Sequence, residues 1–105
     1  MTSNHPISQI DETVHQRYRL GIMAFLSGVE RADFRTARDE LGLTDGNLNR
    51  HLVLLADAGF VDVTKVAPEG KRTRTWLSLT PAGRAALDEH VRALRSIIDS
   101  VPDRT

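Results

Sequence analysis

The sequence predicts a small α+β domain that is mostly α, and three stretches of the chain predict it. Between about residues 11 and 57, apolar side chains recur every three or four positions, which is the period of an α-helix. Between residues 60 and 79 the period shortens to two, which is typical of strands. From residue 81 to residue 100 the helical period returns. We therefore expect three helices, a two-stranded hairpin and a long C-terminal helix.

Length and composition restrict the class of protein. The 105 residues correspond to one domain, which we expect at residues 11–101, between a disordered N-terminal tail (1–10) and a C-terminal tail (102–105). The absence of cysteine excludes disulfides and thiol chemistry. No stretch reaches the roughly 18 apolar residues of a membrane span, and the first residues lack the pattern of a signal peptide. We expect no membrane partner and a cytoplasmic location.

The first two helices have recognisable ends. The first helix is predicted from about Asp11 to Ser27, where Gly28 stops it, and Ser8 or Asp11 offers its N-cap. The second helix is predicted from about Phe34 to Leu41. Asp33 offers its N-cap, and Gly42 follows it, where helices commonly end in a left-handed residue.

The third predicted helix carries the first candidate site. Thr44 offers its N-cap, Gly59 marks its end, and Leu48, Leu52 and Leu55 share one face. With these leucines inward, Asn47 lies on a flank, His51 lies closer to the core boundary, and the outward residues are Gly46, Asn49, Arg50, Val53 and Asp57. This face is either an ordinary solvated surface or one suited to the major groove of DNA, where arginine binds guanine and asparagine binds adenine.

A hairpin follows the third helix. The register that pairs Val61 with Leu79 and Val63 with Leu77 puts these side chains on one face and pairs Thr64 with Trp76 on the other. Pro68-Glu69-Gly70-Lys71 supplies the turn.

The outer half of the hairpin is basic, although the 14 Lys+Arg and 14 Asp+Glu residues of the chain leave no net charge. Residues 65–84 contain Glu69 as their one acidic residue and five basic residues, namely Lys65, Lys71, Arg72, Arg74 and Arg84. A basic turn alone is commonly a soluble loop. Because this one follows a helix with a polar outward face, we interpret it as a phosphate-binding element beside a base-reading helix.

The last predicted helix runs from about Pro81 to Ser100, with Thr80 as its cap and proline at its first position. Apolar residues spaced alternately by four and three positions form a seam along this helix, and they are Leu87, Val91, Leu94, Ile98 and Val101. Ile97 lies beside the seam. The seam either packs on the first helix of the same chain or pairs with a second copy. Because it extends past the expected core, we favour a homodimer.

The order of these elements is that of a winged helix-turn-helix. The stretch "GLTDGNLNRHLVLLADAGFV" resembles the turn, recognition helix and first wing strand of MarR/ArsR-type winged helix regulators, and "LSLTPAGRAAL" resembles their second wing strand and last helix. The resemblance covers about residues 15–98 and is strongest to the short, single-domain group. It implies a homodimeric, nucleoid-associated transcription regulator, most simply a repressor, whose partner is double-stranded DNA.

The resemblance also implies roles for individual residues. Ten residues are expected to contact DNA: those that match the DNA-facing helix and the wing of the family, and the basic residue of the first wing strand. They are Thr44, Gly46, Asn47, Asn49, Arg50, His51, Lys65, Lys71, Arg72 and Arg74. A dimer built from the first and last helices would use Val14, Tyr18, Leu87, Val91, Leu94, Ile97, Ile98 and Val101. We assign no small-molecule effector, because the terminal helices are short for the ligand pocket of the wider family.

Other functions are less well supported by the sequence. Asp88-Glu89-His90 resembles the start of a zinc site in some ArsR-type sensors, but the later histidine of that site would fall near Val101, so we predict no metal and no cofactor. His90 remains able to pair with His15. Phosphate-binding loops, HExxH and nucleophile elbows are absent, so we predict no enzyme. The alternative function is a winged helix that binds protein and not DNA.

Overall fold

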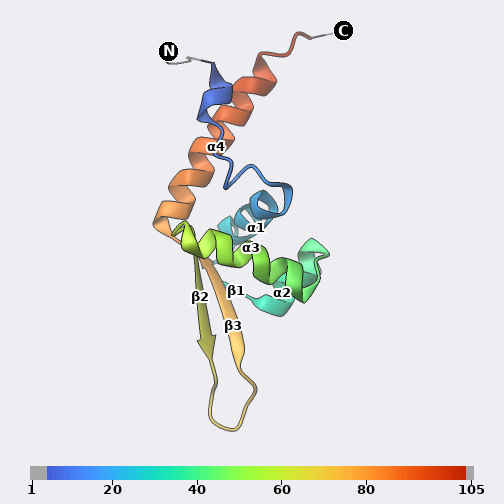
Figure 1. The fold of residues 1–105 in the computed structure, drawn as a ribbon, viewed down its shortest axis with the longest axis vertical. Coiled ribbons are helices and arrows are strands. Elements are labelled where there is room, and N and C mark those ends of the chain that lie inside the picture. The colour runs from blue at the N-terminus through green and yellow to red at the C-terminus, as the bar shows by residue number, and fades with distance from the viewer. Residues whose placement is uncertain (1–4, 104–105) are drawn as a thin grey trace.

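The computed structural model describes residues 5–103 and confirms the predicted fold class. Its elements are the 3₁₀ helix η1 (Pro6–Gln9), α1 (Arg17–Ser27), β1 (Ala32–Asp33), α2 (Phe34–Leu41), α3 (Asp45–Asp57), β2 (Val61–Val66), β3 (Arg74–Leu79) and α4 (Pro81–Asp99). The molecule is elongated, with extents of 59 × 34 × 23 Å. Helices α1 to α3 form its middle, the β2–β3 hairpin projects at one end, and α4 rises toward the other end, where both chain termini lie (Figure 1).

The predicted helix caps of α2, α3 and α4 are confirmed. The carboxylate of Asp33 accepts a hydrogen bond from the backbone N–H of Thr36 at 2.7 Å. The hydroxyls of Thr44 and Thr80 accept from the third residue beyond each, at 3.2 and 2.9 Å. Gly42 has a φ of 65°, so the left-handed exit from α2 is also confirmed. These short-range hydrogen bonds fix where the helices of the helix-turn-helix begin and end.

The first helix begins later than the sequence predicts. Helix α1 starts at Arg17, because the chain first makes a separate turn in which the carboxylate of Asp11 accepts from the N–H of Thr13 at 2.8 Å. The side chain of Gln16 then caps α1, accepting from the N–H groups of Tyr18 and Arg19 at 2.8 and 3.0 Å. An acidic side chain that bonds to its own turn competes with helix formation, so the apolar period before residue 17 does not extend the helix.

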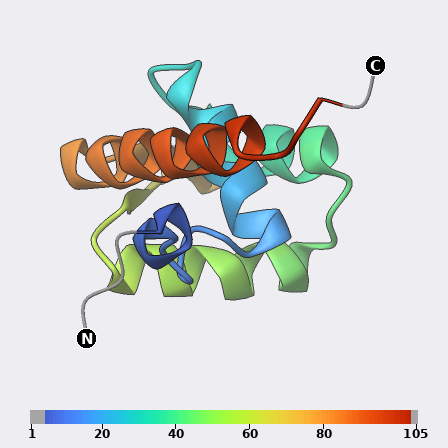
Figure 2. The ribbon, with the colours of Figure 1, turned by 90° about the horizontal axis from the view of Figure 1, so that it is seen from above.

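The described part of the predicted N-terminal tail is folded against α4. Residues 6–9 form η1, which begins with a proline and is capped by the ring nitrogen Nδ1 of His5, an acceptor for the N–H of Ile7 at 3.0 Å. η1 packs on α4, and Figure 2 shows the two elements side by side. Residues 1–4 and 104–105 of the two predicted tails lie outside the described residues.

The hairpin has the predicted register, and the sheet gains a third strand. Val61 pairs with Leu79, Val63 with Leu77 and Thr64 with Trp76, as predicted. Strand β1 adds to the other side of β3, which gives the order β1-β3-β2 within residues 5–103. A strand of two residues is too short to produce a period-two pattern, so the sequence did not predict it.

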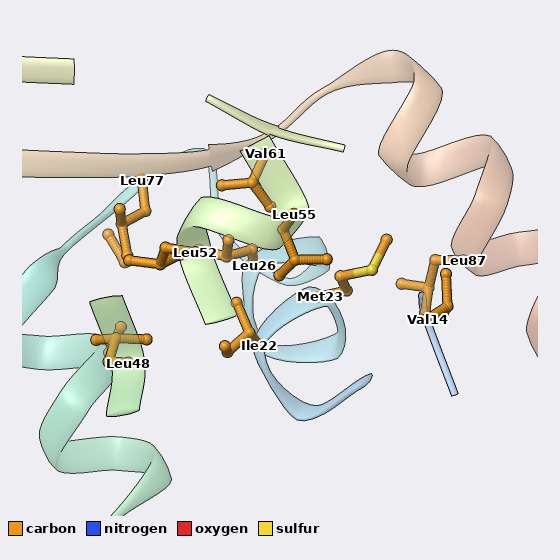
Figure 3. Close-up of a cluster of buried hydrophobic side chains, with 12 residues drawn as sticks. Val14, Ile22, Met23, Leu26, Leu48, Leu52, Leu55, Val61, Leu77 and Leu87 are labelled. Carbon is orange, nitrogen blue, oxygen red and sulfur yellow. The ribbon is translucent and has the colours of Figure 1, made fainter. Parts of the chain in front are cut away.

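The core lies where α1, α3, the sheet and the start of α4 meet (Figure 3). Its largest members include Ile22, Met23 and Leu26 of α1, together with Leu48 and Leu55 of α3. α1 occupies the middle of the fold, with α3 and α4 on opposite sides of it (Figure 2). Helix α3 therefore packs one face on the core and leaves the opposite face outward.

Candidate nucleic-acid interface

Helix α3 presents the outward face that the sequence predicts. Leu48, Leu52 and Leu55 are buried, with at most 2% of each side chain exposed. The exposed residues of the helix and its cap include Thr44, Gly46, Asn47, Asn49, Arg50, Val53 and Asp57. The space where a side chain of Gly46 would lie is open, with no atom within 4 Å. The first two turns of α3 thus carry small and hydrogen-bonding groups that another molecule can approach closely.

Arg38 of α2 forms an ion pair with the first turn of α3. Its Nη1 atom lies 2.8 Å from the carboxylate of Asp45 in the first turn of α3, and its Nε lies 2.9 Å from the carboxylate of Asp39. Hydrogen bonds to Asp39 and then Asp45 raise the pKa of Arg38 above its usual value. No pattern in the sequence singles out this residue, because its partner Asp45 lies in the next helix. Its pairing offsets the negative charge of Asp45 at the surface where a phosphate would approach.

The structure corrects the prediction for His51. Only 4% of this side chain is exposed, and its Nδ1 lies 3.3 Å from Nη1 of Arg19 on α1. Burial, followed by the charges of Arg19 and Arg50, lowers the pKa of His51. A neutral ring can accept the hydrogen bond from the guanidinium through Nδ1. Because His51 lies three positions after Leu48 and four before Leu55, which are both buried, it faces the protein and is unavailable to DNA.

The hairpin carries exposed cations along its outer half. Lys65, Lys71, Arg72 and Arg74 are all exposed. The turn between the strands is closed by a hydrogen bond from the N–H of Lys71 to the carbonyl of Pro68 at 2.9 Å, with Gly70 at a φ of 73°. Arg84, the fifth basic residue of this stretch, instead donates to the carbonyl of Ser27 at 3.0 Å and lies beside α1.

Comparison with known proteins decides the family. The family model described as "Winged helix DNA-binding domain" matches residues 18–98, which is most of the chain and includes α3 and the hairpin. This chain belongs to the winged helix DNA-binding domain family. It is 38% identical over 73 residues to the uncharacterized protein MJ0432 of Methanocaldococcus jannaschii, covering 70% of this chain and 78% of that protein.

Solved structures agree with this family. A transcriptional regulator homologue from Pyrococcus horikoshii superposes with a TM-score of 0.84 at 31% identity, over 90% of this chain and 94% of that one. The MarR family member ZitR of Lactococcus lactis, described as zinc-responsive, superposes with a TM-score of 0.60 at 16% identity, over 81% of this chain and 57% of that one. The fold and the MarR-like resemblance predicted from the sequence are confirmed.

The seam of α4 in this winged helix domain divides into two halves. Leu87 is 5% exposed and Val14 is fully buried, so both belong to the protein's own core and the prediction that they form a dimer interface is wrong. Val91, Leu94 and Ile97 are half-buried. Ile98 and Val101, in contrast, are 67% and 65% exposed. The same heptad spacing therefore serves the core in the first half of the helix and leaves apolar surface in the second.

Two histidines join α4 to the segment before α1. Nδ1 of His15 lies 3.1 Å from Nε2 of His90, the pairing that the sequence left open. Burial, followed by the charge of His15, lowers the pKa of the fully buried His90, while Asp11 opposes this shift. Within the described residues, Nδ1 of His90 has no hydrogen-bond partner, and no group of three or more histidines or carboxylates is close enough to hold a metal ion.

An open groove of about 490 Å³ runs between α1 and α4. The residues that line it include the apolar Leu20 and Val91 and three arginines, Arg84, Arg92 and Arg95. Over residues 5–103, no helix has the length and apolar character that crossing a membrane requires.

Proposed function

We propose that this winged helix domain is a sequence-specific DNA-binding transcription regulator that acts as a homodimer at the nucleoid. The single observation that carries the proposal is that the polar face of α3 and the basic outer half of the hairpin are both exposed. Helix α3 and the hairpin are neighbours in the fold (Figure 1). Helices in the major groove read base edges, while basic residues beside them bind phosphates and set the register.

Helix α3 supplies the base contacts in this proposal. The guanidinium of Arg50 can donate two hydrogen bonds to guanine, and the amide of Asn47 or Asn49 can pair with adenine. Gly46 permits close approach of the helix to the sugar-phosphate backbone, since nothing occupies the space beside it. The Thr44 hydroxyl accepts from the backbone through its oxygen, so its proton is free to bond a phosphate.

The hairpin supplies the phosphate contacts. Lys65, Lys71, Arg72 and Arg74 are exposed, and each cation that meets a phosphate releases counterions. A solved relative of the same fold, MOSR of Mycobacterium tuberculosis, was crystallised in complex with DNA. It is 22% identical, with a TM-score of 0.66 over 94% of this chain and 73% of that one. This relative supports the proposal that the fold suits DNA.

The proposed homodimer uses the free half of the α4 seam. Ile98 and Val101 expose most of their side chains, and Leu94, Ile97, Val91 and Tyr18 expose part of theirs. Covering this surface with the same helix of a second copy would place two recognition helices in successive major grooves, about 34–36 Å apart. Repression by blocking polymerase is the outcome that the family resemblance implies.

The test is a titration of the purified protein into a labelled DNA duplex of mixed sequence. Fluorescence anisotropy measures the binding at about 50 mM and at about 200 mM salt. We expect binding that weakens at least about tenfold over this range. Changing Lys71 and Arg72 together to alanine should reduce the salt dependence. No binding at the lower salt concentration would overturn the proposal and favour the alternative of a protein-binding winged helix.

A further inference from the structure

The outer face of the sheet carries a cluster of three side chains, two of which, Arg31 and Trp76, the DNA-binding proposal has not used. Trp76 lies on β3, with Asp33 of β1 as its neighbour on one side and Thr64 of β2 on the other. The guanidinium carbon of Arg31, which immediately precedes β1, lies 3.8 Å from the centre of the indole ring. The guanidinium carbon of Arg74 lies 5.7 Å from the same centre. We call Arg31, Trp76 and Arg74 the tryptophan cluster.

The tryptophan cluster lies on the face of the hairpin that is turned away from the core. Side chains alternate along a strand, so Trp76 and Arg74 lie opposite Leu77, which is fully buried. The pairing of Lys65 with Thr75 puts Lys65 on the other face, the one shared with Leu77. The hairpin therefore has cations on both faces. Arg31 extends the positive charge of the outer face toward the base of the hairpin.

The stacking of Arg31 orders the guanidinium without consuming its hydrogen bonds. An arginine over an aromatic ring uses the flat face of the guanidinium, so its N–H groups remain directed outward from the edge. Arg31 is exposed, and no ion pair of Arg31 occurs in the described part of the chain. An ordered, solvent-facing guanidinium is the group that binds a phosphate with little loss of side-chain entropy.

The acidic residue closest in register, Asp33, is engaged as the N-cap of α2. The carboxylate of Asp33 is directed to the start of α2, where it caps the N–H of Thr36 at 2.7 Å. That backbone hydrogen bond, and after it the side-chain hydrogen bond of Thr36, lowers the pKa of Asp33, with smaller contributions from Arg74 and Arg35. Arg35 on α2 thus adds a further positive charge near the same edge of the sheet.

We propose that Arg31 and Arg74, ordered by Trp76, form a second phosphodiester-binding site on the outer face of the hairpin. This inference rests on the proposed DNA-binding function and names an additional contact of the same surface. A hairpin at the minor groove, which is about 6 Å wide, has a phosphate strand on either side of it. The face of the hairpin with Lys65 then contacts the phosphates of one DNA strand, and the face with Arg31 and Arg74 contacts those of the other DNA strand.

The test compares the salt dependence of DNA binding between the wild type, Arg31→Gln and the matched control Arg17→Gln. Arg17 also lies over an aromatic ring, with its guanidinium carbon 5.4 Å from the centre of Tyr18, but it belongs to α1 and not to the hairpin. Arg31→Gln should lower the slope of log K against log salt by about 0.9 for each lost phosphate contact. The control should keep the slope of the wild type, and Arg31→Lys should largely restore it.

A second measurement needs no variant. Trp76 is the one tryptophan of the chain, so its fluorescence reports on this cluster alone. Bound DNA should shield it from acrylamide, a neutral quencher. Wild-type slopes for Arg31→Gln, or quenching of Trp76 that DNA leaves unchanged, would overturn the second site. In either case binding by the wild type would leave the proposed function standing, whereas failure of the wild type to bind would refute both.

Discussion

Arg19 of α1 contacts the inward face of α3, where its Nη1 atom lies 3.3 Å from Nδ1 of His51. His51 directly follows Arg50, the residue proposed to read a base. The guanidinium of Arg19 also donates from Nε to the carbonyl of Thr13 at 2.6 Å. Arg19 thus connects the segment before α1 to α3. That segment also meets α4, through the contact of His15 with His90. Helix α4 and the proposed base-reading helix α3 are therefore both tied to the segment before α1 by polar contacts.

The two buried histidines of this chain make stability depend on pH. Burial is the main cause that lowers the pKa of both His51 and His90 in the folded protein. Above about pH 6.5 both rings are neutral in the folded and unfolded states, so they cause no pH dependence there. Below it the unfolded chain binds protons that the folded chain does not. The free energy of unfolding should then fall, by up to about 1.4 kcal/mol per pH unit for each histidine.

Urea denaturation at several pH values between about 7 and 5 measures this effect. Changing both histidines to glutamine should remove most of the acid loss, because glutamine does not titrate and keeps an acceptor for Arg19. An acid loss that is equally large in the double variant would assign it to other groups.

Gly46→Ala should separate stability from DNA binding. No atom lies within 4 Å of the added methyl group, and alanine is the better helix former, so the free protein should gain up to about 1 kcal/mol in a thermal melt. Binding to DNA should weaken, because the methyl group faces the proposed backbone contact. Gly83→Ala is the opposite case, since its added carbon would lie 2.1 Å from the carbonyl oxygen of Phe60 and should destabilise the fold. Equal DNA affinity of Gly46→Ala and the wild type would exclude close approach at this position.

Arg50→Ala should weaken binding to the preferred site by about 1–3 kcal/mol and relax the base preference at one position of each half-site. The side chain is exposed and outward, so the fold should be unaffected. Titration of the preferred duplex and of its single-base variants measures both effects, with Arg17→Ala as the control. An unchanged ranking of the duplexes would show that Arg50 does not read a base.

Ile98→Asp should yield a folded monomer. The side chain is 67% exposed, so a carboxylate costs the isolated chain little, whereas it would be buried without a partner in the proposed dimer. Sedimentation at micromolar concentration measures the mass, and circular dichroism checks the fold. Val29→Asp, at a residue that is 40% exposed in the loop after α1, should keep the mass of the wild type. A dimer that survives in Ile98→Asp would exclude this end of α4 from the interface.

Features governed by neighbours in the sequence could be predicted from it. The caps at Asp33, Thr44 and Thr80 are made by side chains three residues from their donors. The hairpin register followed from matching Val61 and Val63 with Leu79 and Leu77 across one turn. In both cases the partners are close along the chain, so a local pattern specifies them.

Features that depend on distant parts of the chain could not. Leu87 has the spacing of the rest of the α4 seam, and only the packing of α4 against α1 and the segment before it determines that Leu87 and Val14 belong to the core. Arg31 lies 45 residues before Trp76, and β1 alone brings them together. His51 sits at the boundary between the buried and exposed faces of α3, where a helical period cannot distinguish the two sides.

The most direct test of the central claim is selection of binding sites from a library of random duplexes at low and moderate salt, followed by sequencing of the bound fraction. The account predicts enrichment of a palindrome whose half-sites are centred about 34–36 Å, or one helical turn, apart, with the enrichment persisting at moderate salt. Binding without enrichment of any sequence would contradict base reading by α3. The absence of binding at either salt concentration would contradict DNA binding itself.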